Sequence, residues 1–239
     1  MYNIVMRLLT KETEQKIINN NNEISKLLEE NENLYLSELS DLNRRLFSVD
    51  QENKIVIPND YIRKKDQFIE DYGLNNIIYS FNHQSNIAYL MQYADLNSYF
   101  ISRFKIFGQL EKVHYYYSLI NLESILEIII KEIADKYRDI CKECNIQKHK
   151  CSKIISKEIY GNLKLLLCQL NEFQIISIGS EDIENLKELI DVRNQIHIRL
   201  MTEKMYNNSK LSVWFYNKCM NSFKKLMVSI NLENIKCKK

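Results

Sequence analysis

Glycine and proline are scarce in this sequence of 239 residues, which holds only four glycines and a single proline, Pro58. Tight turns between β-strands need glycine, proline or asparagine at defined positions, so a sheet-rich chain of this length would carry many more glycines and prolines. A chain with few turn residues must be built from long elements. We therefore predict an all-α fold, arranged as one large domain or two small ones.

Apolar residues recur at helical spacing through the second half of the sequence. The longest predicted helix carries a continuous apolar stripe that runs from Leu122 through Leu126, Ile129 and Ile133 to Tyr137. We expect the other helices of this half at about residues 85–107 (before a break at Gly108), 163–170, 180–206 and 211–223.

The N-terminal region has a more polar pattern. Residues 11–33 have a helical pattern that we expect Asn19–Asn22 to interrupt. Leucines at positions 36, 39, 42 and 46 predict a second short helix, and the segment KIVIPND predicts an extended connection to a helix that Asp60 caps and that ends at Gly73. The predicted organisation is an N-terminal, mostly helical region over residues 1–80 and a helical bundle over residues 81–235.

Charge and hydropathy indicate a cytoplasmic protein with no membrane contact. The formal net charge is +2, which does not by itself imply a nucleic-acid partner. The densest apolar run, SILEIIIKEI, is interrupted by Glu127 and Lys131, and no stretch of about 18 uncharged apolar residues exists. The N-terminus becomes polar too early for a signal peptide. In the cytoplasm, the six cysteines are expected to be reduced thiols or metal ligands.

The stretch ELIDVRNQIHIRLM, residues 188–201, places an arginine and a histidine on the apolar face of a predicted helix. With about 100° between successive residues, the aliphatic side chains fill one half of the helix circumference, and Arg193 and His197 lie inside that half, one turn apart. A buried arginine needs a partner, because an uncompensated charge is costly. The partner is an acidic side chain, a set of helix carbonyl groups, or a phosphate bound in a cleft.

The stretch LKELIDVRNQIHI resembles the HEPN superfamily (higher eukaryote and prokaryote nucleotide-binding domain). The mark of that family is an arginine, often followed by asparagine, and then a histidine on the third core helix of an all-α bundle. Arg193 and Asn194 match its start, and His197 is the candidate for its end. Three residues separate Arg193 from His197, fewer than is usual in the family. The resemblance implies a HEPN-like helical bundle over roughly residues 85–235.

Active HEPN proteins are metal-independent endoribonucleases of toxin and phage-defence systems that assemble their site across a homodimer. The resemblance therefore implies catalytic roles for Arg193, Asn194 and His197, with no cofactor, and an antitoxin or regulatory protein as a further partner. The residue chemistry agrees. Histidine titrates near neutral pH and can move a proton at the RNA 2′-hydroxyl, while arginine can hold the phosphate and stabilise developing charge. Because one helix supplies one histidine, a two-fold axis beside residues 183–201 would supply the second.

A lysine- and cysteine-rich segment, CKECNIQKHKCSK, follows the longest predicted helix. Its lysines predict an electrostatic approach for an RNA backbone, with a solvated charged loop as the alternative. The lysines concerned are Lys148, Lys150 and Lys153. Zinc is a further alternative, because four residues of this segment have metal-binding side chains. These residues are Cys141, Cys144, His149 and Cys151, but their spacing is uncommon for zinc and favours reduced cysteines.

Two other classes of function stay open at this point. One is a non-catalytic helical dimer, an interaction or regulatory module in which Arg193 and His197 only stabilise an interface. The other is a zinc-stabilised nucleic-acid-binding protein, which depends on residues 141–151 alone.

Overall fold

The computed structural model of this protein describes residues 10–38, 62–78, 80–105, 108–142, 155–194 and 211–231. Every regular element in these ranges is an α-helix, which confirms the predicted all-α fold class. The chain divides into two compact units, Met1–Ile57 and Pro58–Lys239. No helix of the described ranges is both long enough and apolar enough to cross a membrane.

The first unit is represented by one long helix, α1 (Lys11–Glu38). Thr10 caps its N-terminus, since the backbone N–H of Thr13 donates to the Thr10 hydroxyl over 3.2 Å. The predicted interruption at Asn19–Asn22 is wrong, because the helix runs through these residues without a break. Asparagine is only a moderately poor helix former, and the Gln15 side-chain amide donates to Asn19 one turn later.

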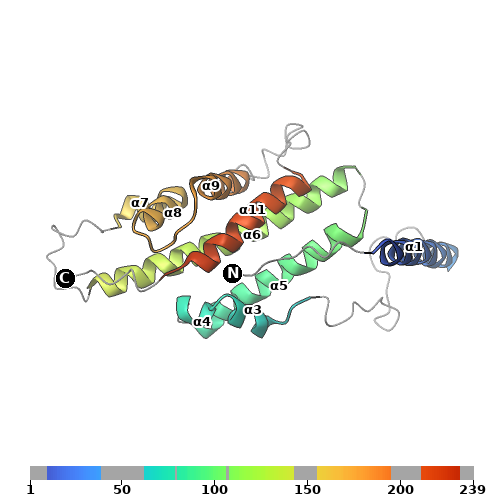
Figure 1. Ribbon diagram of the computed structural model, residues 1–239, viewed down its shortest axis with the longest axis horizontal. Helices are drawn as coiled ribbons and strands as arrows, with labels where there is room; N and C mark the ends of the chain where they lie inside the picture. The colour runs from blue at the N-terminus through green and yellow to red at the C-terminus, as the bar shows by residue number, and fades with distance from the viewer. Residues whose placement is uncertain are drawn as a thin grey trace. The chain divides into compact units, whose positions relative to one another are not determined.

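The second unit is a bundle built around α6 (Gln109–Lys142), its longest described helix. Helix α5 lies along one side of α6, and α8 and α9 lie along the other side (Figure 1). The remaining helices pack on this frame, with α3 on α5, α4 on α6, and α11 on both α6 and α9. The bounds of these helices are α3 Lys65–Asp71, α4 Leu74–Ile77, α5 Phe81–Arg103, α7 Lys157–Gly161, α8 Leu163–Glu172, α9 Ser180–Asn194 and α11 Val213–Ser229.

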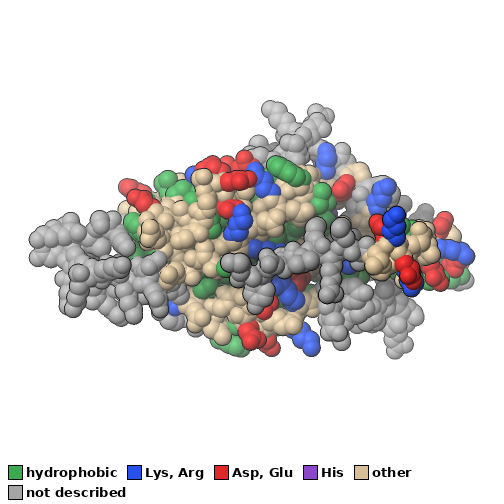
Figure 2. Space-filling view, in the orientation of Figure 1, with side chains coloured by type: hydrophobic (Ala, Val, Ile, Leu, Met, Phe, Trp, Pro, Cys, Tyr) green, Lys and Arg blue, Asp and Glu red, His purple; other side chains and the backbone are tan. Residues whose placement is uncertain are grey.

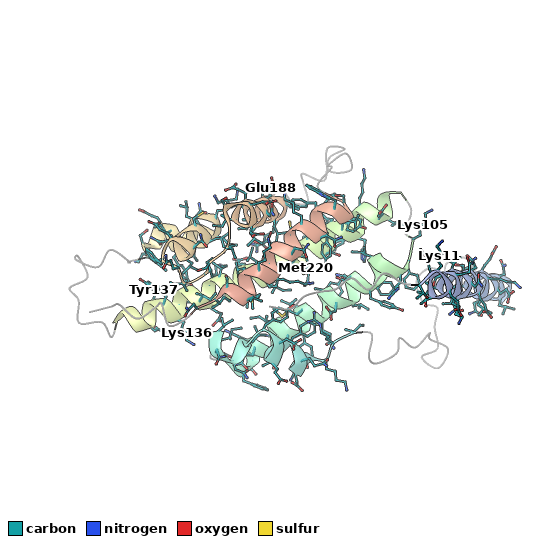
Figure 3. All side chains as sticks on the ribbon, in the orientation of Figure 1. Lys11, Lys105, Lys136, Tyr137, Glu188 and Met220 are labelled. Carbon is teal, nitrogen blue, oxygen red and sulfur yellow. The ribbon has the colours of Figure 1, made fainter. Side chains whose placement is uncertain are left out.

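The apolar stripe predicted for the longest helix forms the centre of the core. Leu122, Leu126, Ile129, Ile133 and Tyr137 are all at most 1% exposed. Full burial of one large aliphatic side chain stabilises a fold by about 1.5–3 kcal/mol, so this stripe is a main source of the stability of the bundle. Helices α9 and α11 both pack on α6, and side chains occupy the space between α9 and its neighbouring helices (Figure 3).

Two glycines mark the predicted breaks. Gly73 and Gly108 adopt φ values of 58° and 64°, a left-handed conformation that glycine adopts without a steric penalty. Gly108 separates α5 from α6 as expected, whereas Gly73 joins α3 to α4 within one core. Phe68 and Leu74, on either side of Gly73, are both buried in that core.

The division between the compact units lies at Ile57 and Pro58, whereas the sequence pattern places a boundary near residue 80. The difference has a physical reason, because α3 and α4 bury apolar side chains against α5 and α6. The extended connection KIVIPND, the Asp60 cap and the short helix predicted after Ser37 lie outside the described residues.

Helix α9 buries most of its apolar face inside its own chain. Leu186, Leu189, Ile190 and Val192 are at most 4% exposed, and α6, α8 and α11 cover them. The sequence pattern predicts an arc too wide for one neighbouring helix, and hence a homodimer built partly on residues 183–201. Three helices of the same chain cover residues 183–192, so their burial does not require a second copy. The homodimer itself stays a prediction.

Candidate functional site

Arg193 lies in the last turn of α9, and its side chain reaches across to α6. Its Nε atom is 3.1 Å from Oε2 of Glu123, and its Nη1 atom is 2.6 Å from Oε2 of Glu127. Nη1 also donates a longer hydrogen bond of 3.4 Å to Oε1 of Glu123. Of the three kinds of partner that the sequence left open for this arginine, the structure shows the acidic one, as a pair of carboxylates on the central helix.

Glu123, Glu127 and Lys131 follow one another at intervals of one helical turn on α6, so their side chains share one face. The Lys131 ammonium donates to Oε1 of Glu127 over 2.5 Å, which leaves Oε2 of the same carboxylate for Arg193. We call these four residues, Arg193, Glu123, Glu127 and Lys131, the Arg193 cluster. It joins the C-terminal end of α9 to the middle of α6.

Burial is very unequal within the Arg193 cluster. The Glu123 side chain is 0% exposed, whereas the Arg193 side chain is 43% exposed. The prediction that Arg193 sits on a buried arc therefore holds for its neighbours in α9 but not for its guanidinium. Among the described residues, the Nη2 atom of Arg193 has no hydrogen bond or ion pair. That edge of the guanidinium can accept an anion.

The environment of Glu123 favours its protonated form. Burial is the largest influence and, together with the nearby charge of Glu127, raises the pKa of Glu123 to about 7, against the opposing influence of Arg193 and Lys131. Its Oε2 atom is buried and accepts no hydrogen bond within the described part of the chain, since the N–H of Arg193 at 3.1 Å is not aligned with it. Glu123 is therefore only partly charged at neutral pH.

Glu127 behaves in the opposite way. Burial alone would raise its pKa, but the hydrogen bond from Lys131 and the charge of Arg193 outweigh burial and hold the pKa of Glu127 below its usual value. Glu127 is therefore charged at neutral pH and carries the permanent negative charge of the cluster. With two cations and one permanent anion, the Arg193 cluster has a net charge between 0 and +1, and protonation of Glu123 sets the value.

A buried polar network between α9 and α11 fixes the position of α9. The Ser222 hydroxyl donates to Oδ1 of Asp182 over 2.8 Å and accepts a 3.0 Å hydrogen bond from the Asn185 amide. Lys225 donates to both carboxylate oxygens of Asp182. Burial alone would raise the pKa of Asp182, but the hydrogen bonds from Lys225 and Ser222 outweigh it, and the pKa is lowered.

The structure locates only part of the predicted RNA-cleaving site. The structure describes both the backbone and the side chain of Arg193. Asn194 is the last residue of α9, and only its backbone is described. His197 lies outside the described residues, as do Lys148, Lys150 and Lys153. The geometry between Arg193 and His197 is thus a prediction from sequence, while the contacts of Arg193 with α6 are observed.

The zinc alternative concerns residues that the structure does not describe. Cys144, His149 and Cys151 lie outside the described ranges, and Cys141 is in the last turn of α6 with its side chain undescribed. In the described ranges, no group of three histidine, cysteine or acidic side chains is arranged to hold a metal ion.

The role of Glu123 and Glu127 was not predicted from the sequence. Glu127 and Lys131 stand out there only as interruptions of an apolar run, and Glu123 has no predicted role. The available signal was the one that identified Arg193, a charged residue inside a buried arc. Glu123 follows Leu122 and lies between the buried Leu119 and Leu126, so the same criterion applied to α6 selects it.

Comparison of the chain with protein-family models, with curated proteins and with solved structures finds no match.

Proposed function

We propose that this protein is a HEPN-like, metal-independent endoribonuclease of toxin or phage-defence type that acts as a homodimer. The observation that carries the proposal is the state of Arg193. Its guanidinium is held on α6 by Glu123 and Glu127, yet 43% of the side chain is exposed and its Nη2 edge has no bond within the described residues. A purely structural role for this arginine does not require an exposed edge without a bond. A half-exposed, oriented guanidinium suits phosphate recognition.

In this proposal the residues divide the work of RNA cleavage. His197 takes the proton from the RNA 2′-hydroxyl or returns one to the leaving oxygen, and the second copy of the chain supplies the histidine for the other transfer. Arg193 holds the phosphate and stabilises its developing negative charge. Asn194 hydrogen-bonds the histidine or a phosphate oxygen.

The carboxylates of α6 support this assignment by limiting where Arg193 can point. Two of its nitrogen atoms lie against Glu123 and Glu127, so the planar guanidinium is oriented before a ligand arrives. The carboxylates do not cancel the cationic character of the cluster, because protonation of Glu123 near pH 7 leaves a net positive charge. An incoming phosphate therefore meets an attractive site.

The second candidate is a non-catalytic helical dimer that serves as an interaction or regulatory module. The contacts of Arg193 with Glu123 and Glu127 favour it, because they give this arginine two carboxylate partners within its own chain and so satisfy its charge without a ligand. In that case the cluster only ties α9 to α6, and His197 has no chemical role.

One experiment separates the two candidates. Purified protein is incubated with labelled single-stranded RNA in excess chelator, beside His197→Ala and the control His83→Ala. His83 is a good control because its side chain is 58% exposed on α5 and pairs with Glu132. The ribonuclease proposal expects cleavage that leaves a 2′,3′-cyclic phosphate, is lost in His197→Ala, and survives in His83→Ala with the fold intact. A clean, dimeric preparation that cleaves no RNA would overturn it in favour of the interaction module.

A further inference from the structure

Helix α1 has a sequence and exposure pattern that the proposed ribonuclease does not use. Nearly all its described side chains are exposed, including five large apolar ones. These are Ile18 at 46%, Ile24 at 50%, Leu27 at 52%, Leu28 at 37% and Leu34 at 65%. A helix that contains four consecutive asparagines has little intrinsic stability in water, and most helices in proteins are stabilised by packing of an apolar face.

The apolar residues of α1 fall on a heptad repeat. With Ile17 as position a, Ile24 is the next a residue, and Leu27 and Leu34 are d residues. Ile at a and Leu at d is the combination that favours parallel two-stranded coiled coils. Leu28 widens the stripe at position e, while Ile18 lies outside it at position b. The stripe is narrow, which fits one partner helix better than a broad protein surface.

Asparagine occupies one further a position, Asn31, and one d position, Asn20. An asparagine at position a lowers the stability of a coiled coil but pairs well with the same asparagine of an identical helix in register. Both asparagines are exposed in this chain. An apolar surface of another protein would leave these amides unsatisfied, whereas an identical parallel helix satisfies Asn31 with its own copy.

The charges on α1 agree with a parallel pair. Residues at positions g and e face each other across a parallel coiled coil, and here g residues Lys16, Glu23 and Glu30 would face uncharged e residues. Those partners are Asn21, Leu28 and Tyr35. No like-charged pair forms across the seam. The ion pairs Lys16–Glu12 at 2.8 Å and Lys26–Glu30 at 3.6 Å lie within one helix, so they stabilise each α1 helix independently of its partner. Acidic and basic side chains mix on the visible face of α1 (Figure 2).

We propose that α1 is a homodimerisation helix that forms a parallel, in-register coiled coil with α1 of a second copy of this chain. The seam consists of Ile17, Ile24, Leu27 and Leu34, with Asn31 fixing the register. The proposed ribonuclease also requires a homodimer, but this coiled coil uses a different helix and does not depend on RNA cleavage. It would tether two copies and raise the local concentration of their catalytic bundles.

Oxidative cross-linking of the full chain tests this arrangement. In a parallel in-register pair, Asn31→Cys places two thiols beside each other on the dimer axis, whereas Glu29→Cys, at position f, points its thiols away from the partner. We expect Asn31→Cys to form an interchain disulfide. The parent chain, which has six cysteines of its own, sets the background, and we expect Glu29→Cys to give no cross-linking above it. Cross-linking at neither position, or equally at both, overturns the proposal.

A charge substitution in the Asn31→Cys chain provides the second arm. Ile24→Glu with Leu27→Glu puts two carboxylates into the seam, and we expect it to abolish the interchain disulfide and to weaken dimerisation at least tenfold by sedimentation. Asn22→Glu with Ser25→Glu adds the same charge at positions f and b, outside the seam. This control should leave the interchain disulfide and the strength of dimerisation unchanged. An interchain disulfide that survives the seam substitution overturns the proposal. The seam variant still forms the dimer of the proposed ribonuclease if that dimer uses α9, so its RNA cleavage at high protein concentration reports on that proposal separately.

Discussion

Arg193 lies with its Nε atom 3.1 Å from Oε2 of Glu123, a residue 70 positions away whose side chain is entirely buried. This relationship links the end of α9 to the centre of the bundle. A buried carboxylate beside a half-exposed guanidinium makes the contact sensitive to pH, because only one of the two groups titrates near neutrality. The contact should therefore respond both to titration and to substitution of either residue.

The first prediction concerns the pH dependence of stability. The pKa of Glu123 is about 7 in the folded protein and has its ordinary value of 4.5 in the unfolded chain, so the folded state binds more protons between these values. The contribution of Glu123 to the free energy of unfolding is therefore most favourable below about pH 4.5 and declines as the pH rises to about 7. The total decline is at most about 3 kcal/mol.

Glu123→Gln isolates that contribution, since it keeps the shape of the side chain and cannot ionise. Urea unfolding of both proteins should be measured from pH 5 to pH 8. The free energy of unfolding of the variant should increase relative to that of the parent chain as the pH rises, and the difference should be constant above about pH 7. Glu172→Gln, an exposed residue at the end of α8, is the control and should show no such trend. A flat difference between Glu123→Gln and the parent chain would contradict the raised pKa.

The second prediction is a strong coupling between Arg193 and Glu123. Arg193→Met leaves Glu123 buried without its main counter-charge, and we expect a loss of about 1–3 kcal/mol of unfolding free energy at pH 8, less than for a fully buried pair. The loss should shrink at pH 5.5, where Glu123 is protonated. Adding Glu123→Gln to Arg193→Met should recover most of the loss at pH 8. Additive losses in this double-mutant cycle would show that the contact carries no coupling energy.

The periodicity of the sequence predicted those features of the fold that depend only on residues close together in the chain. The stripe on α6, the breaks at Gly73 and Gly108 and the start of α9 near Gly179 all depend on residues close in sequence. The Arg193 cluster could not be predicted in the same way. Periodicity shows that Arg193 and Glu123 each occupy an apolar arc, but which helices face each other depends on the packing of the whole bundle. The interruption predicted at Asn19–Asn22 is wrong for a different reason. Asparagine has only a moderately low helix propensity, and this small penalty does not outweigh hydrogen bonds between side chains one helical turn apart.

The third prediction tests the buried network that positions α9. Ser222→Ala removes the hydroxyl that joins Asp182 to Asn185 and should lower the free energy of unfolding by about 1–3 kcal/mol, because buried polar partners lose a hydrogen bond. The neighbouring Asn221→Ala, an exposed position of α11, should change it by less than about 0.5 kcal/mol. Equal effects of the two substitutions in thermal or urea unfolding would show that the network contributes no stability.

The fourth prediction concerns the cysteine-rich segment after α6. If Cys141, Cys144, His149 and Cys151 are reduced thiols beside a solvated histidine, purified protein contains no stoichiometric zinc, and chelator leaves its melting temperature unchanged. Structural zinc would add folding free energy directly, so its removal would be visible as a large destabilisation. Zinc at one equivalent per chain, measured by elemental analysis, would replace this interpretation with a zinc-stabilised loop.

The last prediction concerns the lysines of the same segment as an RNA approach. If Lys148, Lys150 and Lys153 each neutralise an RNA phosphate, changing all three to glutamine should weaken binding of single-stranded RNA. It should also reduce the steepness of log affinity against log salt concentration by about 2, because each phosphate contact on a single strand contributes roughly 0.7 to that slope. The control changes Lys11, Lys16 and Lys26 of α1 to glutamine, which alters the net charge equally at another place in the chain. We expect the control to keep the slope of the parent protein, since it removes none of the three lysines proposed to contact RNA phosphates. Equal losses in the two triple variants would mean that RNA responds to total charge alone, and the lysines of this segment would then be ordinary solvated residues.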